Sequence, residues 1–262
     1  MINVYSPSLT KADERSILAA YRSGWVSSKG SYIDLFEQKF ANFCGVKNAS
    51  AVSNGTVAIH LALLALGITQ KDEVIVPTFT FVGTINPILY IGAKPVFVDC
   101  DPDYWCMDPS EVERKITTKT KAIIAVHLYG HPCDMRKLNS IAKKYKLSII
   151  EDAAEAHGAT YRGIPVGSLS DIATFSFYGN KIITTGEGGM VVSNSSELIK
   201  RVNLLKNHGM SQNKRYWHPV IGYNYRMTNI QAALGSSQLS RFNEIQRKKE
   251  NISNQYQKML DN

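Results

Sequence analysis

The most constraining feature of this 262-residue sequence is a regular alternation of short apolar segments with longer helical patterns. The segments TVAIHLALLALG at 56–67 and MRKLNSIAKKYK at 135–146 carry apolar residues at helical spacing. The short runs are typical of strands: EVIVP at 73–77, KPVFVD at 94–99, KAIIAVH at 121–127 and LSIIED at 147–152. This alternation predicts an α/β fold, with a mainly parallel sheet and helices on both faces.

A single core accounts for most of the chain, because no repeat, low-complexity tract or Pro/Ser-rich linker interrupts its first two thirds. We interpret residues 1–235 as one large domain that includes an N-terminal segment. After about residue 235 the pattern predicts a long helix whose apolar side is formed by Phe242, Ile245, Ile252, Tyr256 and Met259. Residues 236–262 are therefore expected to be the start of a long helix that leads to a C-terminal domain, and we expect the sequence to be cut short within that domain.

The formal net charge of +8 is compatible with nucleic acid, a membrane surface or a phosphorylated small molecule as the partner. The basic residues are scattered, however, and the sequence contains no motif of a DNA- or RNA-binding module. The short basic run RKKE at 247–250 lies in an amphipathic helical pattern and is interpreted as a solvated face. We therefore expect a phosphorylated ligand and no nucleic acid, and salt-dependent DNA binding would reverse that expectation.

The N-terminal sequence MINVYSPSLTKADERS lacks the basic-then-apolar order of a signal peptide. The longest apolar stretch, AIHLALLALGI, is too short to cross a bilayer. These features predict a cytoplasmic protein without a membrane partner. Cys44, Cys100, Cys106 and Cys133 form neither a CxxC pair nor a ligand-spaced cluster with histidine, so we expect reduced structural thiols and no metal site.

Two polar features lie at the ends of predicted elements, one at the end of a strand and one at the start of a helix, where ligands commonly bind. Asp152 stands at the carboxyl end of a predicted strand, where open α/β sheets collect their ligands. Asn54, Gly55 and Thr56 open an apolar helix, whose free amides and dipole form a phosphate site. Each feature also has a structural interpretation, because Asp152 could cap a turn or helix and the 53–56 segment could be an ordinary N-cap.

Lys181 lies between an aromatic strand and small residues in FSFYGNKIITTGEGG, at 175–189, with Ser176 five residues before it. A lysine in a closed site has its charged form disfavoured, which lowers its pKa and leaves an amine able to attack an aldehyde. The alternative is a solvated loop lysine. A phosphate site, a carboxylate and an amine on one α/β framework are together what pyridoxal phosphate requires.

The sequence contains several long motifs: VSNGTVAIHLALLALGI, DEVIVPTFTF, AVHLYGHPCDM, IIEDAAEAHG, FSFYGNKIITTGEGGMVV and GYNYRMTNIQAALG. Together they resemble the DegT/DnrJ/EryC1/StrS family of sugar aminotransferases, which are fold-type I pyridoxal phosphate enzymes. The similarity runs from near residue 5 to the end of the chain. It implies a large cofactor-binding domain followed by a small C-terminal domain that is expected to be missing here.

The resemblance implies a role for four residues around the cofactor ring. Lys181 is expected to bind the cofactor covalently and to carry the proton during amino transfer. Asp152 is expected to pair with the pyridine nitrogen. Glu155 matches a polar position near the phenolic oxygen, although it could be a surface helix residue. Phe81 matches an aromatic that stacks on the ring, and core packing is the alternative.

The resemblance also implies how the phosphate is held. Ser176 and the backbone at Gly55 and Thr56 are expected to bind it, and Asn224 is expected to reach the phosphate of a neighbouring subunit. The active sites would then be shared within a homodimer.

A lysine at position 181 favours amino transfer, because a related branch that removes a sugar hydroxyl has histidine there. His127, His131 and His157 are accordingly interpreted as structural. The reaction implied is transfer of an amino group from L-glutamate to the 4-keto group of a nucleotide-linked 4-keto-6-deoxyhexose. A GDP-linked sugar is preferred, while dTDP and UDP sugars remain open. The alternative is a catalytically silent protein that serves as a dimerisation or scaffold partner.

Overall fold

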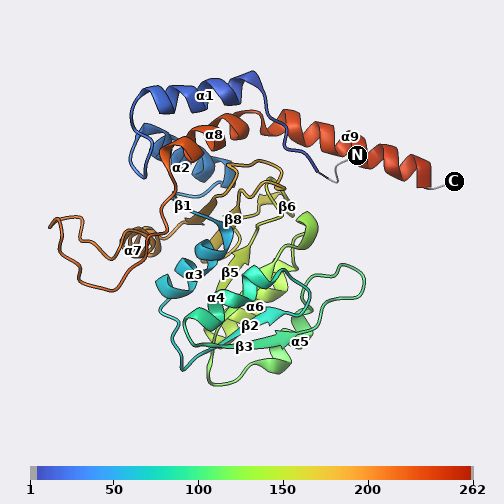
Figure 1. Cartoon of the computed structure of the whole chain (residues 1–262). Helices are drawn as coiled ribbons and strands as arrows, with labels where there is room; N and C mark the ends of the chain where they lie inside the picture. Colours follow the sequence, from blue (N-terminus) through green and yellow to red (C-terminus); the bar gives the residue numbers. More distant parts are fainter. Residues whose placement is uncertain (1–4, 261–262) are drawn as a thin grey trace.

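The computed structural model describes residues 5–260, which are organised around a seven-stranded sheet with the order β1-β9-β8-β5-β4-β2-β3 (Figure 1). Parallel pairing joins β3 to β2, β2 to β4, β4 to β5 and β5 to β8. Only β9 runs antiparallel to its neighbours β8 and β1 in this sheet. The strands are β1 (Asn48–Val52), β2 (Glu73–Pro77), β3 (Lys94–Val98), β4 (Thr120–Val126), β5 (Ser148–Asp152), β8 (Ile172–Ser176) and β9 (Gly189–Ser193).

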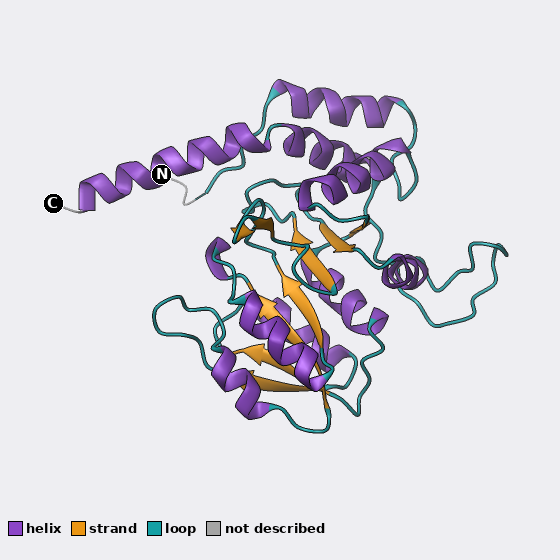
Figure 2. Ribbon diagram, turned by 180° about the vertical axis from the view of Figure 1, so that it is seen from behind, coloured by secondary structure: helices purple, strands orange, loops and turns teal. Residues whose placement is uncertain are grey.

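Helices cover both faces of this sheet, as the sequence predicts (Figure 2). On one face lie α3 (Gly55–Ala65), α4 (Val82–Tyr90) and α7 (Ser196–Lys206). On the other face, α5 (Pro109–Lys115) and α6 (Met135–Tyr145) cover β2, β4 and β5, while α2 (Ser31–Cys44) and α8 (Asn229–Ser240) cover β8 and β9. The remaining elements are α1 (Lys11–Arg22), α9 (Phe242–Leu260), the short helix η1 (Leu128–Gly130) and the hairpin of β6 (Thr160–Tyr161) and β7 (Ile164–Pro165).

The strand sequences supply apolar residues to both faces at once. Along β2, Val74 and Val76 pack under α3 and α4, while Ile75 between them packs against the opposite layer. Such two-sided burial is why these strands read as continuous apolar runs. The four predicted strand segments coincide with β2, β3, β4 and β5, and the two predicted helical segments coincide with α3 and α6.

The C-terminal part differs from the single long helix expected after residue 235. Two helices are present, because α8 ends at Ser240 and α9 begins at Phe242. On α9, Phe242 and Ile245 are buried, while Ile252 is 53% and Met259 75% exposed. Figure 1 shows α9 extending away from the body of the molecule. The expected division between residues 235 and 236 falls inside α8, and it stays a prediction.

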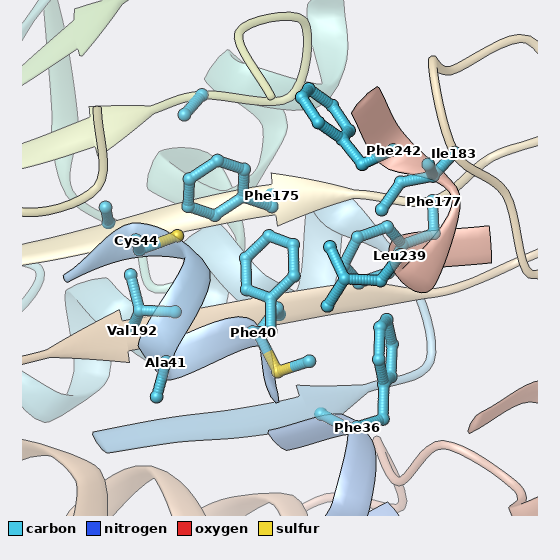
Figure 3. Packing of buried hydrophobic residues seen from close by; sticks show 14 of the residues in the cluster. Phe36, Phe40, Ala41, Cys44, Phe175, Phe177, Ile183, Val192, Leu239 and Phe242 are labelled. Carbon is cyan, nitrogen blue, oxygen red and sulfur yellow. The ribbon is translucent and has the colours of Figure 1, made fainter. Parts of the chain in front are cut away.

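An aromatic cluster joins α2 to the sheet (Figure 3). The ring of Phe40, which is fully buried, lies 4.9 Å from that of Phe175, 5.2 Å from that of Phe177 and 6.0 Å from that of Phe36, measured between centroids. All three contacts have edge-to-face geometry, which aromatic quadrupoles favour. This cluster fixes α2 against β8, the strand that precedes Lys181.

Phe40→Ala is expected to lower the free energy of unfolding by about 3–5 kcal/mol, because it removes a buried ring and leaves a cavity. Leu35 lies on the same helix but is 38% exposed, so Leu35→Ala serves as the matched control with a loss under about 1 kcal/mol. Denaturant unfolding of both variants measures the difference. Equal losses would contradict the role given to this cluster.

Candidate active site

A cavity of about 970 Å³ lies at the carboxyl ends of the parallel strands. Its walls come from the start of α3, the segment after β2, the ends of β4, β5 and β8, and the loop after β8. Seven of the eight predicted site residues line it: Gly55, Thr56, Phe81, Asp152, Glu155, Ser176 and Lys181. The topology therefore collects residues that lie far apart in the sequence, and Asn224 is the exception.

Lys181 lies in the loop after β8 and is held by its backbone at both ends. Its amide donates to the carbonyl of Tyr178 at 2.9 Å, and its carbonyl accepts the Tyr5 hydroxyl at 2.7 Å. The side chain is only 17% exposed, and Nζ lies 3.5 Å from Oε1 of Glu155. This environment excludes a freely solvated loop lysine, which was the alternative interpretation.

Asp152 ends β5 and is buried, with a side chain that contributes to the cavity wall. Its Oδ2 accepts the Thr84 hydroxyl at 2.7 Å, and its Oδ1 accepts the Ala154 amide at 3.2 Å. Burial raises the pKa of Asp152, and these two hydrogen bonds oppose the rise. A buried carboxylate of this kind is stabilised by any cationic N–H group that enters the cavity.

The start of α3 meets the end of β8 at very close range. Asn54 caps the helix by accepting the Val57 amide at 3.0 Å, so the interpretation of this segment as an N-cap is correct for Asn54. A Cβ atom on Gly55 would lie 2.9 Å from Cβ of Ser176, which only glycine avoids. This close approach places the Ser176 hydroxyl beside the helix N-terminus, where the dipole favours an anion. An N-cap and a phosphate site are compatible here.

The structure excludes the alternative interpretations of Phe81 and Glu155. Phe81 is not a core residue, and Glu155 is not part of a surface helix. The Phe81 ring is 76% exposed, so core packing is excluded, and it lies across Gly83, where a Cβ atom would come within 2.9 Å of it. Glu155 lies in a turn instead of a surface helix. Its Oε2 accepts the Tyr129 amide at 2.8 Å, while its Oε1 is the atom nearest Nζ of Lys181.

Asn224 lies outside the walls of this cavity. It is exposed, and its Oδ1 accepts two hydrogen bonds from Arg226, from Nε at 3.1 Å and from a terminal nitrogen at 2.8 Å. Within the described residues, the side-chain hydrogen bonds of Asn224 are made to Arg226 and not to the seven clustered residues. Its assignment to the site of a neighbouring subunit stays a prediction.

Comparison with known proteins agrees with this geometry. Residues 7–262 match the DegT/DnrJ/EryC1/StrS aminotransferase family. The chain belongs to this family. The predicted family, the fold-type I architecture and the dependence of the family on pyridoxal phosphate are thereby confirmed.

Two curated relatives of this chain are GDP-perosamine synthases, which agrees with the expected preference for a GDP-linked sugar. The protein from Escherichia coli O157:H7 is 54% identical over 260 residues, which are 99% of this chain and 71% of that one. The protein from Caulobacter vibrioides is 50% identical over 259 residues, which are 99% and 70% of the two chains.

Solved structures of aminotransferases share the fold over most of this chain. The aminotransferase from Psychrobacter cryohalolentis is 41% identical with a TM-score of 0.87, and the match covers 90% of this chain and 63% of that one. Spr1654 from Streptococcus pneumoniae in its PLP form is 31% identical with a TM-score of 0.93, and the match covers 98% and 71%. The chain thus spans between 63% and 71% of the length of these four relatives.

The residues of the cavity fit pyridoxal phosphate on structural grounds. An exposed aromatic ring, that of Phe81, faces a volume large enough for a planar pyridine ring. Asp152 offers a buried carboxylate for a ring N–H, and the α3 N-terminus with Ser176 offers donors for a phosphate. Lys181 supplies the amine that an aldehyde requires. The individual roles of these residues remain the predictions stated above.

Sequence reasoning missed two participants of the cavity. Thr84 donates to Asp152 and also forms a hydrogen bond with Thr80 at 2.8 Å, but it lies in the apolar segment FVGTINP and gives no local signal. Tyr129 contributes its backbone amide to Glu155, a contact that depends on its left-handed φ of +49°. The Tyr-Gly pair at 129–130 indicates a turn, but it does not indicate that the Tyr129 amide binds Glu155.

The three histidines interpreted as structural lie in different environments. The ring of His127 is buried and lies between the Cys133 amide and the carboxylate of Glu151. His131 stacks on Tyr104, with ring centroids 5.2 Å apart. His157 is buried among phenylalanine rings, and within residues 5–260 its Nε2 has no hydrogen-bond partner.

Three further findings bear on the sequence predictions. Cys44, Cys100, Cys106 and Cys133 are free thiols. Among residues 5–260, no group of three or more His, Cys, Asp or Glu side chains could hold a metal ion. In the same part of the chain, no helix combines the length and apolar character needed to span a membrane.

The burial of His157 beside the site predicts a pH dependence of the free energy of unfolding. Burial, assisted by the positive charge of Lys181, lowers the pKa of His157 from 6.5 to about 3. Between these two pH values the unfolded chain binds a proton that the folded chain does not, so acidification favours unfolding. The free energy of unfolding should fall by up to about 1.4 kcal/mol per pH unit from this group alone.

His157→Phe should remove that contribution, so stability measured by denaturant at several pH values should depend less on pH in the variant. The substitution also changes the packing of this ring against Phe40, Phe175 and Phe177, which shifts the stability of the variant by a pH-independent amount. Parallel pH profiles for the two proteins would show that folding does not lower the pKa of His157 and would contradict this prediction.

Proposed function

We propose that this chain transfers an amino group from L-glutamate to the 4-keto group of GDP-4-keto-6-deoxymannose, giving GDP-perosamine. The observation that carries the proposal is the shared cavity of the Lys181 amine and the buried Asp152 carboxylate. Identities of 50–54% to three GDP-perosamine synthases support the choice of nucleotide sugar. The net charge of +8 is consistent with substrates that carry phosphate.

Lys181 has two assigned tasks in this proposal. It binds the aldehyde of pyridoxal phosphate, a cofactor that supplies an electron sink for the substrate carbon when bound. When it is free, its amine would take a proton from the Cα of the amino donor and, in the second half of the reaction, would deliver a proton to the sugar carbon that receives the amino group. Glu155, 3.5 Å from Nζ, lies close enough to orient this amine.

Asp152 and its partners keep a proton at the ring nitrogen. The carboxylate favours the protonated ring electrostatically, and the Thr84 hydroxyl at 2.7 Å fixes its orientation. Phe81 would cover one face of the ring, and the amides of Gly55 and Thr56 with the Ser176 hydroxyl would anchor the phosphate.

A homodimer is part of the proposal. Asn224 is exposed and lies outside the cavity of its own chain, which is consistent with a contribution to the site of a second copy. In that arrangement each active site is built from two chains.

The alternative of a catalytically silent scaffold is less well supported. A scaffold has no chemical need for a shielded lysine, a buried carboxylate and a serine beside a helix N-terminus in one cavity. The choice of GDP over dTDP or UDP rests on the relatives, so a kinetic comparison of the three nucleotide sugars tests it.

Lys181→Ala is expected to abolish both the visible absorbance of the bound cofactor and amino transfer, with a loss of at least about 10²–10⁴-fold in rate. Lys121→Ala is the matched control, because Lys121 is exposed on β4 and should be replaceable without effect. Amino transfer is measured with L-glutamate and each of the GDP-, dTDP- and UDP-linked 4-keto-6-deoxy sugars. Wild-type turnover in Lys181→Ala would refute the assignment, and preference for a dTDP or UDP sugar would refute the substrate.

A further inference from the structure

Glu155, which lies beside Lys181 in the cavity, also contacts a turn of the chain with an unusual backbone conformation. Residues 127–133 connect β4 to α6 and contain η1, in which Tyr129 has φ +49° and Gly130 has φ +88°. A bulky aromatic residue in the left-handed region is uncommon and is retained only when surrounding contacts enforce it. That conformation aims the Tyr129 amide at Oε2 of Glu155, at 2.8 Å.

The contact that anchors this turn is made by the ring of His127. Its Nδ1 accepts the Cys133 amide at 3.2 Å, which ties the last residue of the turn to the first. Its Nε2 lies 3.1 Å from Oε2 of Glu151 and must donate to it, because Nδ1 is already an acceptor. The backbone amide of His127 also donates to the Asp152 carbonyl at 3.0 Å.

Glu151 holds the His127 ring in that tautomer and orientation. Its side chain is fully buried and is absent from the cavity wall, so it faces away from the site to which Asp152 contributes. Besides the histidine, three donors from the loop after β7 meet its two oxygens at 2.8–2.9 Å: the amides of Gly167 and Leu169 and the hydroxyl of Ser170. Four donors on one carboxylate leave it little freedom to move.

We propose that His127, held by Glu151, is a positioning residue for the amino-transfer reaction. It anchors the 127–133 turn so that the Tyr129 amide fixes Glu155 beside the Lys181 amine. This inference rests on the proposed function for its catalytic consequence, while the anchoring itself is a property of the chain without cofactor. His127 also lines the cavity. The hydrogen bonds of its ring go to Glu151 and to the Cys133 amide, so the route that we propose to Glu155 runs through the turn.

The first test uses the cofactor-free protein and hydrogen exchange of the Tyr129 and Cys133 amides. His127→Phe removes both ring contacts and should speed exchange at both amides by at least about tenfold. His127→Asn can place its Oδ1 where Nδ1 lies, so it should retain most of the protection. His131→Ala is the matched control, because this histidine of the same turn stacks on Tyr104 and makes none of the proposed contacts with its ring.

The second test separates positioning from general destabilisation by a double-mutant cycle. His127→Phe should lower the kcat of amino transfer about tenfold in the wild-type background and less than about twofold when Glu155 is already alanine. Unfolding free energies measured in parallel show that each variant is folded under the assay conditions, so that a loss of kcat is not a loss of folded protein. Additive losses in kcat, or equal exchange in the Phe and Asn variants, would overturn the proposal.

Gly130→Ala keeps the test decisive if His127→Phe fails to fold. It strains the turn through its φ of +88° and brings a Cβ atom within 3.4 Å of the Glu155 carbonyl, without touching the buried pair. It should give the same exchange at Tyr129 and the same dependence on Glu155, and wild-type behaviour in both would overturn the proposal. If the wild-type protein transfers no amino group, the proposed function fails while the exchange result still decides the anchoring.

Discussion

The end of β5 is the point on which both the scaffold and the cavity depend. Glu151 and Asp152 are consecutive, and because side chains alternate along a strand they point to opposite sides of the sheet. Asp152 contributes its carboxylate to the cavity. On the opposite, buried side, the Glu151 carboxylate accepts hydrogen bonds from three donors of the 167–170 loop and from the His127 ring. A one-residue shift in the register of β5 would exchange these roles and destroy both arrangements.

Close packing of backbone elements defines the cavity on its other side. Gly55 lets the start of α3 approach β8, and Gly189 on β9 lies so near Asn54 that a Cβ atom there would be 2.4 Å from its carbonyl oxygen. The antiparallel strand β9 is thus pressed against the helix N-terminus that we assign to the phosphate. Both the stability of the fold and the proposed phosphate site require glycine at positions 55 and 189, because a side chain at either position would separate α3 from the sheet.

Much of the fold and part of the site could be predicted from the sequence, because the relevant signals are local. Apolar runs in the sequence predicted β2, β3, β4 and β5. The position of Lys181 between an aromatic strand and small residues distinguished it from an ordinary surface lysine. The antiparallel direction of β9 and the break between α8 and α9 could not be predicted, because sheet order and packing on α1 and α2 decide them. Thr84 and the Tyr129 amide were missed for the same reason, since each acts on a residue 26 to 68 positions away.

The central claim is that Lys181 binds pyridoxal phosphate and takes part in amino transfer. Its most direct test is borohydride reduction of the purified protein with added cofactor, followed by peptide mapping by mass spectrometry, with and without prior addition of L-glutamate. We predict a pyridoxyl group on Lys181 that is lost when glutamate is added first, because the amino donor releases the lysine. A pyridoxyl group on other lysines, or one on Lys181 that does not respond to glutamate, would contradict this claim.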